Sequence, residues 1–380
     1  MKTQTCEREM RIALIIPVLA EGGAGRVMVN MANYWVAADH VVTLFTFESE
    51  HQPPFYKVDD RVDFCYLRIE KHSVSFRDRL VNNWDRSKTI RRAVISARPD
   101  VVISFIDTGN VRVLLSLLGA GIPVVISERV HPAHEQIGWT WRVLRRLTYP
   151  TASSVVVQTS DAHKYIQGWM LRQLRVIPNA VNVPISTGEA PTLYDRNLLA
   201  VGRLRPQKSF SLLLRAFSLV ADECPEWNLN IAGDGPLRES LDAQVVRLRL
   251  QGRVTLLGQQ SDIAGLLSQS EVYVLSSAYE GFPNALCEAM ASGLACISTE
   301  CPSGPADIIT NEVNGLLVAS SDEKALAAAL RKLMVDESLR ARLGRNAREI
   351  TETYSVERIM GMWNKLLTDV VGKARGGSSG

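Results

Sequence analysis

Residues 272–293 read Val272-Tyr-Val-Leu-Ser-Ser-Ala-Tyr-Glu280-Gly-Phe-Pro-Asn-Ala-Leu-Cys-Glu288-Ala-Met-Ala-Ser-Gly293. The β-branched beginning predicts a buried strand, and the part after the turn predicts a helix with small residues on one side. Two carboxylates bracket the helix start, Glu280 on the turn and Glu288 one turn into the helix. Unpaired backbone N–H groups and about half a positive charge at a helix N-terminus favour phosphate. The segment therefore predicts a site that holds a nucleotide diphosphate by its phosphates and its sugars.

Short β-branched runs alternate with helix-length segments along the whole chain. Near-continuous apolar strands separated by helices predict parallel sheets that are covered on both faces. Seven strand candidates precede residue 181 and six follow residue 196, which is more than one sheet comfortably holds. We therefore expect an α/β fold with two doubly wound, Rossmann-like domains that face a cleft.

The domain boundaries follow from composition. We expect residues 1–181 to form the first domain and residues 197–353 the second. Residues 182–196 carry Pro, Gly and polar residues without periodicity, which predicts a linker. Residues 354–375 predict an amphipathic helix with a Ser cap, placed to cross back onto the first domain. Residues 376–380, Gly-Gly-Ser-Ser-Gly, resemble a tag or linker and are excluded from the fold.

The amino-acid composition limits the kinds of function that this chain can have. The formal net charge of +3 on 380 residues is too small for a dedicated nucleic-acid binder. Ten Lys/Arg against four Asp/Glu between Arg61 and Arg98 nevertheless predict a locally basic surface. Six cysteines without Cys-x-x-Cys spacing predict reduced thiols. Without a membrane-spanning apolar run or a signal peptide, we expect a cytoplasmic protein that can associate with the inner face of the membrane.

A basic turn, Gly202-Arg203-Leu-Arg-Pro-Gln-Lys208, directly follows the strand candidate at 197–201. It places cations at the carboxyl end of a parallel strand, where such sheets bind ligands. Arg203 can fork onto phosphate oxygens, and Lys208 adds a compact charge. The alternative is a solvated basic turn, but the two glutamates of the same domain favour phosphate binding.

Two glycine-rich turns also follow strand candidates. Gly233-Asp234-Gly235 allows close backbone approach to a ligand, or is an ordinary strand-to-helix turn. Gly22-Gly23-Ala-Gly-Arg follows the first strand but does not match the Gly-x-Gly-x-x-Gly fingerprint of dinucleotide sites. Such a loop at the start of a helix suits phosphate or a transferred sugar.

Metal-binding motifs are missing from the sequence. It contains no Asp-x-Asp pair, and His131 and His134 lack the rest of a zinc signature. We therefore expect no metal and no resident cofactor, so that the positive charge for a departing diphosphate comes from Arg203, Lys208 and the helix N-terminus.

Together these motifs resemble the family 4 retaining glycosyltransferases of GT-B fold, over essentially the whole chain. The resemblance implies that the second domain binds the nucleotide sugar, that the first binds the acceptor, and that the last helix returns to the first domain. It places Glu280 by the donor sugar, Glu288 at the ribose hydroxyls, and Arg203 and Lys208 at the diphosphate. It also implies retention at the anomeric carbon without a metal. The remaining donor-side candidates are Gly22, Gly23, Gly202, Gly233, Asp234, Gly235, Gly281, Phe282, Asn284 and Ala285.

The first domain looks closest to members that extend lipid-linked oligosaccharides or surface polysaccharides. Two segments resemble those members: residues 103–110, which contain Asp107, and residues 125–129, which end in Glu128-Arg129. Arg129 stands where several relatives have His, and His131 is a candidate substitute. Asp107, Glu128, Arg129 and His131 are therefore candidates for the acceptor or sugar side.

The segment 137–149 mixes aromatic residues with cations. Trp and Arg together suit the edge of an anionic bilayer or a lipid-pyrophosphate acceptor. The alternative is an amphipathic helix whose Trp and Leu pack on the sheet while its Arg residues face water.

These observations predict the transfer of a hexose from a nucleotide diphosphate sugar to a growing, lipid-linked glycan, with UDP favoured over GDP. Two alternatives stay open at this point. A nucleotide-sugar epimerase or hydrolase would consume or isomerise the donor without an acceptor, and a silent nucleotide-sugar binder would bind UDP without any transfer.

Overall fold

The computed structural model describes residues 9–19, 22–49, 53–69, 76–131, 133, 137–168, 170, 173–193 and 195–376. The strands are β1 Arg11–Ile16, β2 Val41–Thr46, β3 Asp63–Tyr66, β4 Val101–Phe105, β5 Val124–Ser127, β6 Ser154–Val157, β7 Leu174–Val176, β8 Asn197–Val201, β9 Asn228–Ala232, β10 Val254–Gly258, β11 Val272–Leu275, β12 Ala295–Glu300 and β13 Leu316–Ala319. The α-helices are α1 Gly23–Ala37, α2 Phe76–Ala97, α3 Asp107–Leu117, α4 Trp139–Thr148, α5 Ser160–Gln167, α6 Phe210–Ser218, α7 Arg238–Arg247, α8 Ile263–Ser268, α9 Asn284–Ala291, α10 Pro305–Ile308, α11 Glu323–Val335, α12 Glu337–Ala347, α13 Ile350–Thr353 and α14 Val356–Gly376, and the 3₁₀ turns are η1 Tyr149–Thr151 and η2 Pro206–Lys208.

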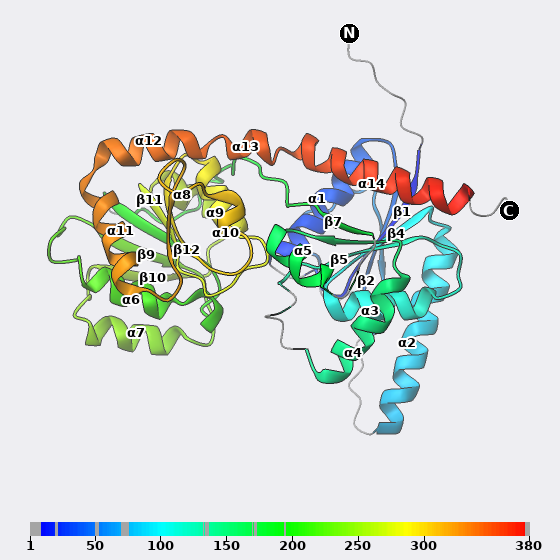
Figure 1. The fold of residues 1–380 in the computed structure, drawn as a ribbon. Coiled ribbons are helices and arrows are strands. Elements are labelled where there is room, and N and C mark those ends of the chain that lie inside the picture. The colour runs from blue at the N-terminus through cyan, green and yellow to red at the C-terminus, as the bar shows by residue number, and fades with distance from the viewer. Residues whose placement is uncertain are drawn as a thin grey trace, which may run out of the picture. The chain divides into compact units, whose positions relative to one another are not determined.

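The chain forms two compact units (Figure 1). The first contains the residues up to Gln158, Ala162–Ile177 and the residues from Met360 onward. The second contains Thr159–Asp161 and Pro178–Ile359. Each unit holds one sheet of parallel strands with helices on both faces, so the predicted class of two doubly wound α/β domains is confirmed.

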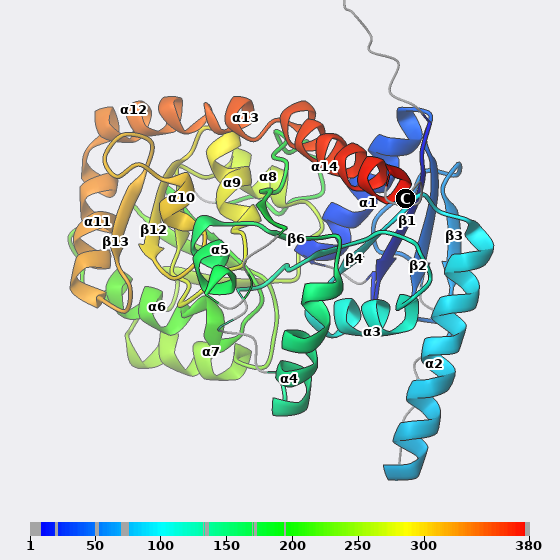
Figure 2. The ribbon, with the colours of Figure 1, turned by 45° about the vertical axis from the view of Figure 1, so that its right-hand side comes forward.

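The sheet of the first unit has the order β3-β2-β1-β4-β5-β6-β7. Alternate residues of a strand face opposite sides, and both sides of β1 are buried. Helices α2, α3, α4 and α5 contribute to the core on one side. On the other side, α14 crosses α1 in both views (Figure 2), and Trp35 Nε1 of α1 donates to Asn364 Oδ1 of α14 at 2.8 Å. The C-terminal helix therefore belongs to the core of the first unit, as predicted.

The sheet of the second unit has the order β10-β9-β8-β11-β12-β13. Leu198 and Ala200 of β8 face a core built with α6, α7 and α11, whereas Leu199 faces a core built with α8, α9 and α13. The chain leaves β8 toward β9 on one side and leaves β11 toward β12 on the other. The boundary between β8 and β11 is therefore a topological switch point, where sheets of this kind bind ligands at the carboxyl ends of the strands.

The predicted linker, residues 182–196, clusters with the second unit. Asp262 Oδ2 accepts a hydrogen bond from Ser186 Oγ at 2.7 Å and bonds from the amides of residues 187–189 at 3.0 to 3.2 Å. Burial acts to raise the pKa of Asp262, but these hydrogen bonds outweigh it and lower the pKa to about 2. This segment is therefore tied to the unit that follows it.

Candidate functional site

The donor-side candidates gather at one edge of the second sheet. Gly202, Arg203 and Lys208 follow β8, the turn 233–235 follows β9, and Glu280 follows β11. Because parallel strands end at the same edge, the topology brings these loops together at the switch point.

Lys208 and Glu280 form the central contact of this edge. Lys208 Nζ lies 2.7 Å from Glu280 Oε1, and the two side chains are 18% and 7% exposed. Ser277 Oγ donates to the same carboxylate oxygen at 2.5 Å. The amide of Glu280 donates to Pro302 O at 3.2 Å. The sequence predicted both charged residues but not Ser277, and not their mutual pairing.

Three further hydrogen bonds join the loop after β8 to the loop after β11. The amide of Ala278 donates to Gln207 O at 2.8 Å, and Gln207 Nε2 donates to Tyr279 O at 3.0 Å. Ser276 Oγ donates to Lys208 O at 2.8 Å. The position of the lysine relative to the glutamate is therefore fixed by backbone contacts as well as by charge.

Helix α9 begins at Asn284, immediately after this loop. Its first turn contains no acidic side chain, so the helix leaves its positive end available to an anion. Gly281 and Ala285 are half-buried, Phe282 is buried, and Pro283 has no N–H to donate. Asn284 is held from outside the loop, because Asn179 Nδ2 donates to its Oδ1 at 2.8 Å.

Glu288 is half-buried in the second turn of α9. Behind it lies Tyr273 of β11, which is fully buried and whose hydroxyl has no hydrogen-bond partner among the described residues. Burial, together with the negative charge of Glu280, raises the pKa of Tyr273 well above its ordinary value. The sequence did not identify Tyr273, because a tyrosine in a buried strand is indistinguishable from an ordinary core residue.

The glycine turns fit tightly between the loops. Gly233 has φ +139°, and a Cβ atom there would lie 2.0 Å from Gly202 O. A Cβ on Gly235 would lie 2.7 Å from Leu204 O. Any side chain at these positions would push the loops after β8 and β9 apart, so the glycines are required by packing as well as by access.

Asp234 and Arg203 both have exposed side chains at this edge. Asp234 Oδ1 accepts from the amide of Gly235 at 2.7 Å, and its Oδ2 lies 3.8 Å from Arg238 Nη1. The arrangement therefore presents two exposed charged groups around the pair of half-buried Lys208 and buried Glu280.

In the first unit, the switch point lies between β1 and β4. Gly22 precedes α1, and Gly23 is its first residue; the amide of Gly22 donates to Tyr56 Oη at 3.2 Å. Glu48, which the sequence did not single out, is buried behind this loop and accepts from the amide of Leu19 at 2.8 Å.

Asp107 and Glu128 are both buried at the carboxyl ends of β4 and β5. Burial raises the pKa of Asp107 above its ordinary 3.8. Glu128 accepts a hydrogen bond from the Tyr149 hydroxyl, and Arg145 Nη1 lies 3.9 Å from its Oε1. Burial and the charge of Glu128 raise the pKa of Tyr149 well above its ordinary value. The carboxylate of Glu128 is therefore integrated into a buried network.

Arg129 is buried with only 9% of its surface exposed. Its guanidinium carbon lies 3.8 Å from the centre of the Phe105 ring, and its Nη1 donates to Ser127 Oγ at 3.4 Å. Burial lowers the pKa of Arg129 to about 9. His131 is also buried, accepts from the amide of Ala133 at its Nδ1, and packs 5.5 Å from the Tyr165 ring. His134 lies outside the described residues.

Within the described residues, no three His, Cys, Asp or Glu side chains lie together in a way that could hold a metal ion. The five described cysteines are free thiols, and burial, aided by the charge of Glu280, raises the pKa of Cys301 to about 12. Across the same described ranges, no helix is long and apolar enough to cross a membrane.

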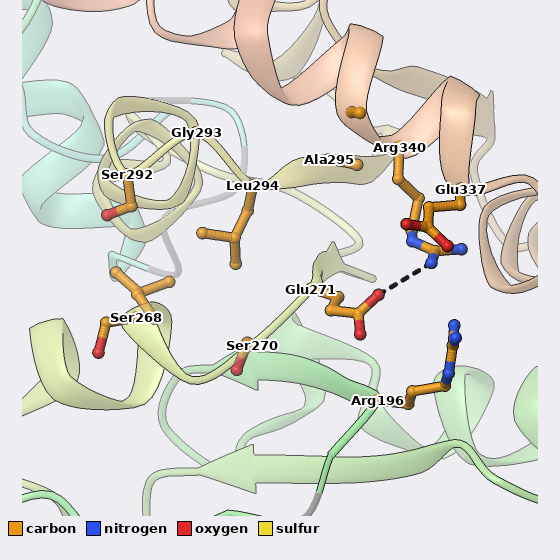
Figure 3. Close-up of a pocket in the computed structure, with 12 residues that line it drawn as sticks. Arg196, Ser268, Ser270, Glu271, Ser292, Gly293, Leu294, Ala295, Glu337 and Arg340 are labelled. Atoms are coloured by element: carbon orange, nitrogen blue, oxygen red, sulfur yellow. Dashed lines mark ion pairs between the residues drawn. The ribbon is translucent and has the colours of Figure 1, made fainter.

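A cavity of about 380 Å³ lies at the opposite edge of the second sheet, before β8, β11 and β12 (Figure 3). Arg340 and Glu271 pair across it at 3.0 Å. Arg340 Nη1 also donates to Leu333 O at 2.7 Å and to Met334 O at 3.1 Å. This ion pair anchors the start of α12, and no predicted site residue lines the cavity.

Comparison with known proteins matches both halves of the chain. The model for glycosyl transferases group 1 matches residues 191–350, and the model for Glycosyltransferase Family 4 matches residues 21–183. A relative from Campylobacter jejuni is described as an α-1,4-N-acetyl-D-galactosaminyltransferase acting on a saccharide linked to diphospho-undecaprenol. It is 29% identical over 363 residues, which cover 95% of this chain and 99% of that protein.

Two solved structures share the fold of the whole chain. Sucrose-phosphate synthase from Thermosynechococcus elongatus superposes with a TM-score of 0.83 at 20% identity, covering 96% of this chain and 100% of that one. HepE from Anabaena, solved in complex with UDP, superposes with a TM-score of 0.77 at 19% identity, covering 95% and 100%.

Proposed function

Because this chain belongs to the family 4 glycosyltransferases of GT-B fold, we propose that it moves a hexose from a UDP-sugar to a lipid-linked glycan. The transfer retains the configuration of the anomeric carbon and uses no metal ion. The observation that carries the proposal is the pairing of Lys208 with the buried Glu280, next to the start of α9 at a topological switch point.

The charges of this edge suit a sugar diphosphate. The free positive end of α9 and the guanidinium of Arg203 favour the phosphates, and Lys208 supplies a third positive group. Leaving-group charge that develops as the anomeric bond breaks is then stabilised by donors already in place. Glu280, held by Lys208 and Ser277, orients the sugar, and Glu288 takes the ribose hydroxyls.

UDP is favoured over GDP because a structural neighbour of the same fold was solved with UDP. A lipid-linked acceptor is favoured because the Campylobacter relative acts on a diphospho-undecaprenol saccharide.

The surface of α4 supports an acceptor that resides in a membrane. Trp141 and Leu144 pack on the core, but Trp139, Val143 and Leu147 form an exposed apolar stripe at four-residue spacing, with exposed fractions of 71%, 47% and 67%. The exposed side chains of Arg142 and Arg146 lie beside the stripe. An apolar stripe flanked by cations fits an anionic lipid surface, which we include as the docking partner of the first unit.

A panel of UDP- and GDP-sugars, assayed by thermal shift and by transfer to a short-chain polyprenyl-diphosphate saccharide, tests the proposal. We expect a UDP-sugar to be consumed only with acceptor present, with undiminished rate in EDTA. Glu280→Ala should abolish transfer while UDP still binds, and Glu226→Ala, an exposed carboxylate of the same unit, should leave both intact. Donor hydrolysis or epimerisation without acceptor would indicate the rival enzyme class, and UDP binding without any transfer would indicate a silent binder.

A further inference from the structure

The guanidinium of Arg129 is a buried cation that the protein itself does not neutralise. Its Nε and Nη2 have no hydrogen-bond partner among the described residues, and its Nη1 makes one long bond, to Ser127. No carboxylate of the described chain forms an ion pair with it. Burying an unpaired charge is costly, so such a group needs a reason beyond packing.

Arg340 shows how this chain treats a buried arginine that serves only the structure. Its exposed fraction, 7%, is close to the 9% of Arg129. Yet Arg340 pairs with Glu271 and donates to two backbone carbonyl groups. Arg129 has the same burial without the partners, and this contrast separates it from a structural arginine.

The residues around Arg129 fix the orientation of its guanidinium but do not neutralise its charge. The Phe105 ring, 3.8 Å from the guanidinium carbon, fixes the plane of the group. Phe105 and Ser127 are paired neighbours at the carboxyl ends of β4 and β5, so Arg129 extends from the ligand-binding edge of the first sheet. Asp107, two residues beyond Phe105, also keeps a buried oxygen, Oδ2, without a partner. The ligand-binding edge of the first sheet thus holds two buried donors, Nε and Nη2 of Arg129, and one buried acceptor, Oδ2 of Asp107, that no described residue engages.

We propose that Arg129 recognises an oxyanion, a carboxylate or a phosphate, on a saccharide substrate of this enzyme. A guanidinium fork matches the two oxygens of such a group, whereas a neutral hydroxyl would leave the buried charge uncompensated. The inference rests on the proposed function, since it assigns a charged substrate to that transfer. The oxyanion has two possible sources, the sugar of the donor and the diphosphate of the lipid-linked acceptor.

Two probe pairs distinguish the sources, measured by calorimetric binding to the full chain. The first pair is UDP-glucuronic acid against UDP-glucose, and the second is farnesyl diphosphate against farnesol. In one pair we expect the wild type to prefer the charged member, and Arg129→Met to reduce that preference by about 10- to 100-fold. The pair that responds identifies the source. Arg92→Met, an exposed arginine of the same unit, should leave both preferences unchanged.

Arg129→Lys serves as a second variant, because it keeps the charge and loses the fork. It should lose part of the preference, and it remains informative where Arg129→Met folds poorly. Preferences within twofold of the wild type in both variants and both pairs would overturn the inference and make Arg129 a packing residue. Transfer by the wild type, measured on the same preparation, tests the proposed function separately, since transfer with unchanged preferences refutes only the role of Arg129.

Discussion

Replacing Lys208 by Met and Glu280 by Gln, singly and together, measures what the buried pair contributes. Removing one partner of a buried ion pair costs about 3–5 kcal/mol. Lys208→Met leaves the carboxylate of Glu280, 7% exposed, with the hydroxyl of Ser277 alone, and we expect a loss of about 3 kcal/mol. Glu280→Gln keeps an oxygen for Ser277 and leaves an ammonium that is 18% exposed and reaches water, so about 1 kcal/mol is expected.

The double variant should cost about 2 kcal/mol less than the sum of the two single variants, because its second substitution removes a group that is already unpaired. Urea unfolding, followed through the transition that UDP shifts, gives the three free energies without assuming that both units unfold together. The same variants separate binding from catalysis. UDP affinity should fall about tenfold or more in Lys208→Met and stay within a few-fold in Glu280→Gln, which still loses transfer. Additive stabilities, or a larger loss in Glu280→Gln than in Lys208→Met, would refute the pairing argument.

Three further outcomes follow from the described geometry. Gly233→Ala should destabilise the second unit by about 3 kcal/mol or more in urea unfolding, because its Cβ would lie 2.0 Å from a carbonyl oxygen, whereas Gly252→Ala, at φ +76° in open space, should cost about 1 kcal/mol. Burial raises the pKa of Asp107 above 3.8, so near pH 4 and above the folded state keeps a proton that the unfolded chain releases. The free energy of unfolding should therefore fall as the pH rises from about 4. Asp107→Asn should flatten this dependence, measured by urea unfolding between about pH 4 and 7. Trp139→Ser with Leu147→Ser should weaken co-sedimentation with anionic vesicles by about tenfold or more while UDP binding persists, and equal sedimentation would remove α4 from the docking surface.

Local patterns predicted the parts of the fold that depend on neighbouring residues. The alternation of apolar runs with helix-length segments gave thirteen strand candidates, and the sheets contain seven and six strands. The turn at residues 233–235 was identifiable from the sequence because glycine marks positions where the backbone has a positive φ or passes close to another segment. The amphipathic pattern of the last helix was also sufficient, since apolar residues such as Trp363 and Leu367 are buried.

Contacts between distant residues could not be predicted in this way. Lys208 and Glu280 are separated by 72 residues, and their pairing follows from the order of strands in the sheet rather than from either motif. Asp262 is a second example. It accepts hydrogen bonds from residues 186–189 and so ties them to the second unit, but no motif near it in the sequence predicts these bonds. For α4, the sequence left packing and membrane contact as alternatives. In the structure, Trp141 is half-buried and packs against the core, whereas Trp139 is exposed.

The two candidate edges differ in how they treat charge. At the edge of the second unit, the buried carboxylate of Glu280 already has a cation and a hydroxyl, so its geometry is set before a ligand arrives. At the edge of the first unit, Arg129 and Asp107 are buried with unused hydrogen-bonding atoms. The groups of a preassembled site already have hydrogen-bond and charge partners within the protein. Such a site therefore binds features that many substrates share. A site with an uncompensated charge discriminates strongly, since only a ligand with the complementary group relieves the cost of burial. Substrate selectivity should therefore depend more on Arg129 and Asp107 than on the Lys208–Glu280 pair.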